Sequence, residues 1–286
     1  MLNLQRVVID YAVSELRSAY VKTYSDMEQQ LGNIMVWSCH LALENIANSD
    51  ALYHDLDHTV MVATAGQAIL EGKHLSEGGI TPGDWVHVMI ALLCHDIGYV
   101  KGVCRGDGDG FFATGVGDGV VEISSTHTDA ALAPYHVDRS KLFVRERFGN
   151  NLLSGMAKVI DAELLASHIE MTRFPVPEED RHKDPKDYPA LVRAADLIGQ
   201  LGDPNRLLRC PALFYEFQEI GLNEELGYMT PGDLRQSNAK FYWDVVSPYI
   251  QGALRYLRVT QEGKQWVANL YANVLAALNG NTPGVM

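Results

Sequence analysis

The segment 81–96 constrains the fold of this chain more than any other. Thr81, Pro82 and Asp84 are typical of a helix start, because each residue type is favoured at the N-cap or in the first turn. The run WVHVMIALLCHD that follows is apolar on nearly every side. A helix of this kind is buried all round, so we expect a central helix that carries His95 and Asp96 at its carboxyl end.

Helical spacing of apolar residues recurs along most of the chain. It predicts further helices over residues 4–20, 34–46, 125–136, 152–169, 188–201, 204–220, 234–257 and 261–278. Alternating runs of strand type are scarce. The sequence therefore predicts an all-α fold.

Two segments interrupt this pattern and are expected to be loops. Residues 102–119 are rich in glycine, and residues 174–189 are charged and rich in proline. Asp107 and Asp109 resemble the start of a calcium-binding loop, but Phe111 and Phe112 stand where further oxygen ligands are needed. We interpret the first loop as a mobile lid or an insertion near the functional site.

No repeat and no linker divides the chain into two patterned halves. We expect one domain over residues 1–286, with the motif-bearing core at about 50–200 and helical elaborations at 1–49 and 201–286.

Composition excludes several classes of function. The 36 acidic and 23 basic residues give a net charge of −13, which repels a nucleic-acid backbone. The longest apolar run, Val88 to Cys94, is far shorter than the roughly 20 residues of a membrane span.

The N-terminal residues lack the apolar centre of a signal peptide, so we expect a cytoplasmic protein. Its four cysteines are well separated and are expected to be buried thiols: Cys39, Cys94, Cys104 and Cys210.

Histidines and aspartates are placed on three of the predicted helices. Residues 53–58 are expected to open a helix, which would put His54 and His58 on one face. His95 and Asp96 emerge from the apolar run, and Asp196 lies on an otherwise apolar helical face. A buried carboxylate is costly without a partner, and a divalent cation suits a neutral imidazole beside a carboxylate. The pattern indicates a metal site, although Arg193 is an alternative ion-pair partner for Asp196.

The order of these residues resembles a known signature. His58, then His95-Asp96, then Asp196 resembles the H…HD…D pattern of the HD-domain metal-dependent phosphohydrolase superfamily. The phrase YHDLDH at residues 53–58 is similar to the YHNxxH phrase of its cyclic-nucleotide phosphodiesterase-like members, with Asp55 in place of the asparagine. The resemblance covers about residues 50–200 and implies an HD-domain helical bundle with extra N- and C-terminal helices.

The resemblance also implies a ligand set for one or two divalent metal ions. In the binuclear branches of the superfamily, Asp96 would bridge the metals, and His58, His95 and Asp196 would hold the first. His127 and His168, which follow in the expected order, would hold the second. The metal identity is open among Fe, Mn, Mg, Zn and Ni. Five other histidines are expected to be structural or exposed: His40, His74, His87, His136 and His182.

The chemistry implied is hydrolysis of a small phosphoester, such as a nucleotide or cyclic nucleotide, by a metal-activated water. His54, four residues before His58, is the candidate general acid for the leaving oxygen. Lys101, Arg105 and Arg193 are candidate substrate-phosphate ligands, with ordinary surface charge as the alternative.

Two other functions use the same residues. The ligand order also resembles that of HD-fold diiron oxygenases acting on a small polar substrate, but those enzymes do not need His54. The third hypothesis is a ligand sensor without catalytic activity. The complete ligand set argues against it, because an inactive site would usually have lost at least one ligand. The partner is expected to be a small molecule, and a homo-oligomer is left open.

Overall fold

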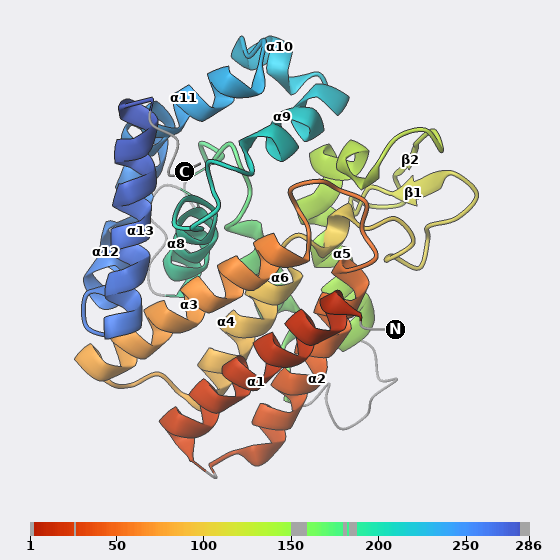
Figure 1. Ribbon diagram of the computed structural model, residues 1–286. Coiled ribbons are helices and arrows are strands. Elements are labelled where there is room, and N and C mark those ends of the chain that lie inside the picture. The colour runs from red at the N-terminus through yellow and green to blue at the C-terminus, as the bar shows by residue number, and fades with distance from the viewer. Residues whose placement is uncertain (1–2, 26, 150–158, 180–181, 183–187, 281–286) are drawn as a thin grey trace.

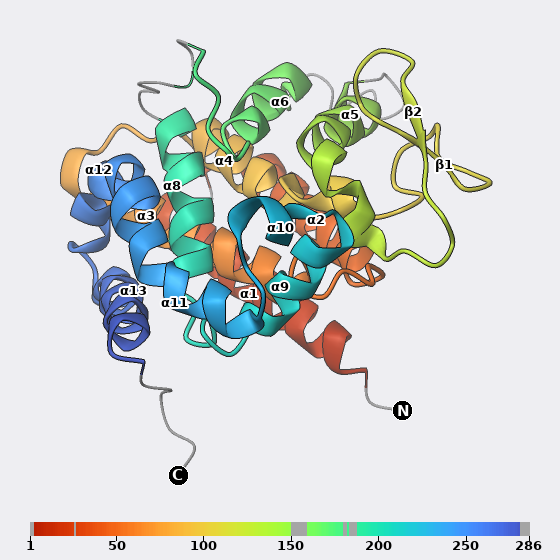
Figure 2. The same cartoon turned by 90° about the horizontal axis from the view of Figure 1, so that it is seen from above.

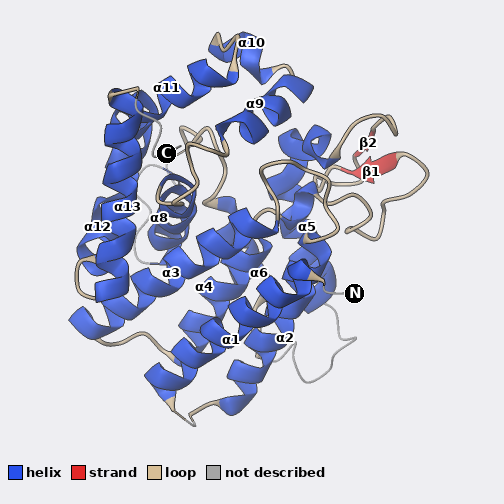
Figure 3. Cartoon of the chain, viewed as in Figure 1, coloured by secondary structure: helices blue, strands red, loops and turns tan. Residues whose placement is uncertain are grey.

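The computed structural model describes residues 3–25, 27–149, 159–179, 182 and 188–280. These residues are predominantly α-helical, which confirms the predicted all-α fold (Figures 1 and 3). None of the helices in the described ranges has the length and apolar character of a membrane span. The helices are α1 (Leu4–Tyr24), α2 (Gln29–Ile46), α3 (Leu56–Glu77), α4 (Pro82–Cys94), α5 (His136–Phe148), α6 (Ala162–Glu170), α8 (Tyr188–Leu201), α9 (Cys210–Glu219), α10 (Leu222–Leu226), α11 (Pro231–Phe241), α12 (Ser247–Leu257) and α13 (Gln261–Leu278).

Helix α4 is the central helix that the sequence predicts. The Thr81 side chain accepts a hydrogen bond from the Asp84 N–H, and the Asp84 side chain accepts one from the Thr81 N–H, which closes a capping box. Every residue from Trp85 to Cys94 is buried. The helix packs against α2, α3, α6 and α8, so all its faces are covered.

Helices α3 and α8 pack closely along each other beside α4. A Cβ atom at Gly199 of α8 would lie 2.6 Å from the Cα of Val62 in α3, so only glycine permits this approach. The contact brings the N-terminal end of α3 and the middle of α8 to the carboxyl end of α4. This is where the candidate ligands of the three helices meet.

Helices outside the motif-bearing core share its apolar interior. One continuous cluster of buried side chains extends from Ile9 of α1 to Ala277 of α13. Helix α12 packs on α3 and α8, while α1 and α2 cover the other side of the core (Figures 1 and 2). All four cysteines are free and buried, as predicted.

Some predicted helices differ from those observed. Pro134 interrupts the predicted helix 125–136, because it cannot donate a backbone hydrogen bond; a 3₁₀ stretch, Asp129–Tyr135, precedes α5 instead. The predicted helix 204–220 begins only at Cys210. The predicted helix 234–257 consists of α11 and α12, joined by a π-helical turn, Tyr242–Val246. Residues 152–158 of the helix predicted at 152–169 lie outside the described residues.

The glycine-rich loop 102–119 contributes to an antiparallel hairpin of β1 (Phe111–Ala113) and β2 (Val120–Glu122). Asp107 and Arg139 of α5 form an ion pair of 2.9 Å in which both side chains are fully buried. The Asp107 carboxylate also accepts the N–H groups of Gly102, Cys104 and Ala113. These donors occupy the carboxylate, so the segment is anchored on α5 and Asp107 is not a calcium ligand.

Replacing Asp107 by asparagine should destabilise the protein by about 3–5 kcal/mol, because it leaves the buried Arg139 guanidinium without a counter-charge. Denaturant unfolding at neutral pH measures this change. A loss below about 1 kcal/mol, the range of an exposed ion pair, would contradict the structural role of the pair.

Candidate metal centre

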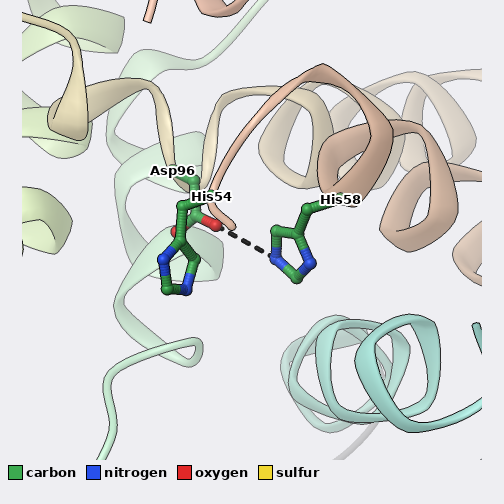
Figure 4. A group of neighbouring side chains, drawn as sticks. All are labelled: His54, His58 and Asp96. Carbon is green, nitrogen blue, oxygen red and sulfur yellow. Dashed lines mark ion pairs between the residues drawn. The ribbon is translucent and has the colours of Figure 1, made fainter. Parts of the chain in front are cut away.

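Four side chains from α3, α4 and α8 converge at the carboxyl end of α4. The Nε2 atoms of His58 and His95 lie 3.1 and 3.0 Å from Oδ2 of Asp96. The same two nitrogens lie 3.9 and 3.7 Å from Oδ1 of Asp196. Figure 4 shows the His58 ring turned toward Asp96. The structure thus brings together His58, His95, Asp96 and Asp196, the four residues that sequence analysis grouped as ligands of one cation.

The hydrogen bonds of His95 fix which ring nitrogen is available. Its Nδ1 lies 2.7 Å from the carbonyl oxygen of Leu92, so the ring donates there and Nε2 is the nitrogen that faces the carboxylates. Burial lowers the pKa of His95, but Asp96 and Asp196 outweigh it and raise the pKa to about 9, so a bound cation would replace the Nε2 proton. The buried atoms His95 Nε2 and Asp96 Oδ2 lie 3.0 Å apart, but neither has a hydrogen bond of suitable geometry within the described part of the chain. Buried polar atoms are rarely left unpaired. A cation bound between them would satisfy both, so the donor set fits a divalent metal.

The electrostatics of the cluster also suit a cation. Burial lowers the pKa of His58 to about 4, so this imidazole is neutral and able to ligate. Burial, together with the nearby Asp96 charge, raises the pKa of Asp196 to about 6. Burial opposes ionisation of Asp96, but His95 and His58 outweigh it and hold the Asp96 pKa well below its usual value. A cation between the two carboxylates would offset their mutual repulsion.

His136 is a further histidine at this site, which sequence analysis expected to be structural or exposed. Its Nε2 lies 3.7 Å from Oδ1 of Asp96, on the carboxylate oxygen that His58 and His95 do not face. Its Nδ1 lies 2.5 Å from the carbonyl oxygen of Ala133, so Nε2 is the nitrogen that faces the carboxylate. His136 is therefore partly buried against the cluster rather than exposed, and it is a candidate ligand that the sequence did not single out.

Gly98 explains why His136 reaches the site. A Cβ atom on Gly98 would lie 2.0 Å from the carbonyl oxygen of His136, so only glycine lets α5 approach the turn after Asp96. Ser140 then donates to the His95 carbonyl oxygen at 2.7 Å and accepts from the Gly98 N–H at 2.9 Å. Arg139 donates to the Gly98 carbonyl oxygen at 2.6 Å. The glycine of the His95-Asp96 motif was the sequence signal for this contact.

The structure does not bring His127 or His168 to the cluster. His127 is exposed, and its backbone carbonyl accepts a hydrogen bond from Lys101 at 2.6 Å. His168 is buried, and the titratable neighbours that shift its pKa are His87 and Asp84 in the first half of α4. His87 lies eight residues before His95, about 12 Å along the helix. The structure therefore places neither His127 nor His168 beside the carboxylates of the cluster.

His54 lies beside the cluster but not on the predicted helical face. Helix α3 begins at Leu56, with Asp55 as its N-cap accepting from the His58 N–H, so His54 precedes the helix. The rings of His54 and His58 are nevertheless 5.3 Å apart between centroids. The residue stays within reach of the ligands because of contacts made by a later part of the chain.

Glu216 of α9 makes the decisive contact to His54. Its Oε2 lies 2.5 Å from His54 Nδ1, while its Oε1 accepts the backbone N–H groups of Tyr53 and His54. Burial lowers the pKa of His54, but the Glu216 carboxylate outweighs burial and raises it overall. His54 thus has a carboxylate that orients its ring and stabilises its protonated form. Glu216 could not be predicted from the sequence, because an acidic residue in an amphipathic helix carries no signal of its own.

Two arginines of the same region hold the segment before α3. Arg209 donates to Oδ1 of Asp55 at 2.6 Å and to the carbonyl oxygen of Tyr53 at 2.7 Å. Arg206 donates to the Tyr53 hydroxyl at 2.9 Å. Residues after 201 therefore form part of the site, whereas sequence analysis treated them as an elaboration.

The three cations predicted to bind substrate have other partners. Lys101 donates to the carbonyl oxygen of His127 and lies 3.8 Å from Asp129. Arg105 is exposed and donates to the carbonyl oxygen of Glu146. Arg193 is buried and donates to the carbonyl oxygens of Met171 and His182, at 3.0 and 2.9 Å, rather than to Asp196. The guanidinium of Arg193 is therefore a structural group in this arrangement.

Comparison with known proteins gives a family and no activity. A family model described as Npun_R2479-like matches residues 2–279. No curated protein matches the chain.

Proposed function

We propose a function from the site itself, because the chain belongs to the Npun_R2479-like family and the description of that family names no activity. The function that the site supports best is metal-dependent hydrolysis of a small phosphoester, in a protein of the HD-domain superfamily. One observation carries the proposal. A carboxylate-paired histidine, His54, lies beside four converging ligands, and two of their buried atoms, His95 Nε2 and Asp96 Oδ2, have no hydrogen-bond partner in the described residues.

The first cation would be held by His58, His95, Asp96 and Asp196. A divalent cation bound there lowers the pKa of a coordinated water toward neutrality and offsets negative charge on a phosphoryl group. The mixed nitrogen and oxygen donors suit Fe, Mn, Zn or Ni. They suit Mg less well, because Mg prefers oxygen ligands. The protein supplies two imidazoles, of which His95 is oriented by the carbonyl oxygen of Leu92, together with the buried carboxylate of Asp96 and the partly buried carboxylate of Asp196.

His54 would supply the proton that the leaving oxygen needs. Its Nδ1 is engaged by Glu216, so the Nε2 proton is the one available for donation. Glu216 keeps the ring protonated and oriented, since it raises the His54 pKa against the effect of burial. This pair favours hydrolysis over oxygenase chemistry, which has no step that requires a general acid at this position.

The second cation, if bound, would be held by Oδ1 of Asp96 and by His136. In this proposal His136 replaces His127 and His168. The substrate is a small molecule, and Lys101, five residues after Asp96, is the candidate cation for its phosphate. The free, buried cysteines suit a reducing compartment, so the proposal includes a cytoplasmic location.

We expect His136→Ala to lower the number of bound Mn²⁺ ions from two to one, because it removes the imidazole nitrogen that pairs with Oδ1 of Asp96. His168→Ala, another buried histidine, is the matched control and should bind as many ions as the parent protein. Isothermal titration calorimetry on metal-stripped protein measures both. Equal stoichiometry in the parent and His136→Ala proteins, with loss in His168→Ala, would restore the ligand set implied by the resemblance.

The proposed function is tested on protein stripped of metal and reloaded separately with Mn²⁺, Fe²⁺, Zn²⁺, Ni²⁺ or Mg²⁺. Each sample is assayed for phosphate-ester cleavage on nucleotides, cyclic nucleotides and alkyl phosphates, and in parallel for dioxygen consumption. Hydrolysis restored by one or more metals supports the proposal. Dioxygen consumption by the iron form without hydrolysis would favour the oxygenase, and binding without turnover would favour a ligand sensor.

A further inference from the structure

We propose that Tyr99 is a positioning residue that couples the general acid to the second cation position by stacking between His54 and His136. The inference rests on the proposed function for the roles of the two histidines. It does not require a hydroxyl contact, because the phenol ring itself makes both interactions.

The three rings form a continuous stack. The Tyr99 and His54 rings have centroids 4.5 Å apart and an interplanar angle of 9°. The Tyr99 and His136 rings have centroids 4.6 Å apart and an interplanar angle of 26°. Both distances lie at the short end of the range for aromatic pairs. Only 4% of Tyr99 is exposed, so its ring has little freedom to leave this position.

Each histidine is also fixed at its Nδ1 atom. Glu216 engages Nδ1 of His54, and the carbonyl oxygen of Ala133 engages Nδ1 of His136. The side-chain bond and this hydrogen bond together still allow each ring to tilt. The stack on Tyr99 restricts that tilt and so narrows the direction in which each Nε2 atom points.

The three residues come from separate parts of the chain. His54 precedes α3, Tyr99 ends the 3₁₀ turn Ile97–Tyr99, and His136 begins α5. Tyr99 lies three residues after Asp96, so the backbone that carries the central carboxylate also carries the ring between the two histidines. Loss of the Tyr99 ring should therefore loosen both His54, the general acid, and His136 at the second cation position. The first cation position should stay intact.

The variants Tyr99→Phe and Tyr99→Leu separate the ring from the hydroxyl. Titration of metal-stripped protein with Mn²⁺ gives the affinities of the first and second positions. Turnover is compared for an alkyl phosphoester, whose leaving oxygen needs a proton, and a p-nitrophenyl ester, whose leaving oxygen does not. Tyr99→Met is made as well, because its flexible side chain fills the space of the ring without a π face.

Tyr99→Phe should resemble the parent protein within about twofold. Tyr99→Leu and Tyr99→Met should weaken the second Mn²⁺ by about 2- to 10-fold, the range of one aromatic pair, with the first unchanged. In Tyr99→Leu and Tyr99→Met, the rate of hydrolysis should fall more for the alkyl ester than for the p-nitrophenyl ester. An unchanged first-ion affinity shows that a variant is folded.

Two results would overturn the inference. Parent-like second-ion affinity and ester ratio in Tyr99→Leu and Tyr99→Met would mean that the stack positions nothing. A loss in Tyr99→Phe equal to that in Tyr99→Leu would assign the effect to the hydroxyl. If the parent protein cleaves no phosphoester, the proposed function fails, while the second-ion affinities still decide whether the ring positions His136.

Discussion

Asp96→Asn should bind neither cation and should retain less than about 1% of parent turnover. The carboxylate faces His58 and His95 with one oxygen and His136 with the other, so both metal positions depend on its charge. Loss of residues that merely orient ligands typically costs 10- to 100-fold in metal affinity or activity, and loss of a shared ligand should cost more than about 100-fold. Elemental analysis of protein purified without chelator measures the metal.

Asp107→Asn is the control for this result, because it also neutralises a fully buried aspartate. It should lower the free energy of unfolding but leave the first metal position of the folded protein occupied, because Asp107 pairs with Arg139 and not with the ligands of that position. His58→Ala should resemble Asp96→Asn at the first position. Parent-like metal content in Asp96→Asn would rule out this carboxylate as the shared ligand.

His54→Ala should slow hydrolysis of alkyl phosphoesters by about 10²- to 10⁴-fold, the usual contribution of a general acid, with bound metal unchanged. The effect should be much smaller for p-nitrophenyl esters, because their leaving oxygen needs little protonation. Steady-state kinetics on the two substrate types measures the difference. An equal rate loss on both would mean that His54 does not donate the proton.

Glu216→Gln should move the pH profile of the same reaction. The Glu216 carboxylate raises the pKa of His54. Its loss lowers that pKa, so the acid loses its proton at lower pH and the descending limb of the profile shifts to lower pH. Glu219→Gln is the matched control on the same helix, because the Glu219 carboxylate accepts from Thr128 and not from His54. If the descending limb shifts equally in Glu216→Gln and Glu219→Gln, the shift is caused by the change in overall charge and not by the contact of Glu216 with His54.

Sequence reasoning succeeded where a long apolar pattern decided the structure. Helix α4 was predictable because its capping residues and apolar surface point to the same buried element. Helices α8 and α13 have the predicted bounds, 188–201 and 261–278, for the same reason. Once these helices pack, the positions of His95, Asp96 and Asp196 follow from their places in the pattern.

The remaining site residues could not be predicted in this way, because tertiary contacts choose them. His136 reaches Asp96 only because Gly98 lets α5 approach, and Glu216 reaches His54 from a helix about 160 residues later in the chain. Neither contact leaves a periodic signal. Chain order favoured His127 and His168 as ligands, but order does not determine which histidine faces a carboxylate.

The most direct test of the metal centre is anomalous diffraction from crystals of the Mn²⁺-loaded protein. The predicted result is a peak with His58 Nε2, His95 Nε2 and oxygens of Asp96 and Asp196 all within about 2.0–2.3 Å, the range of bonds from first-row metals to nitrogen and oxygen. A fully loaded crystal with no peak among these four side chains, or with its strongest peak elsewhere, would contradict the account.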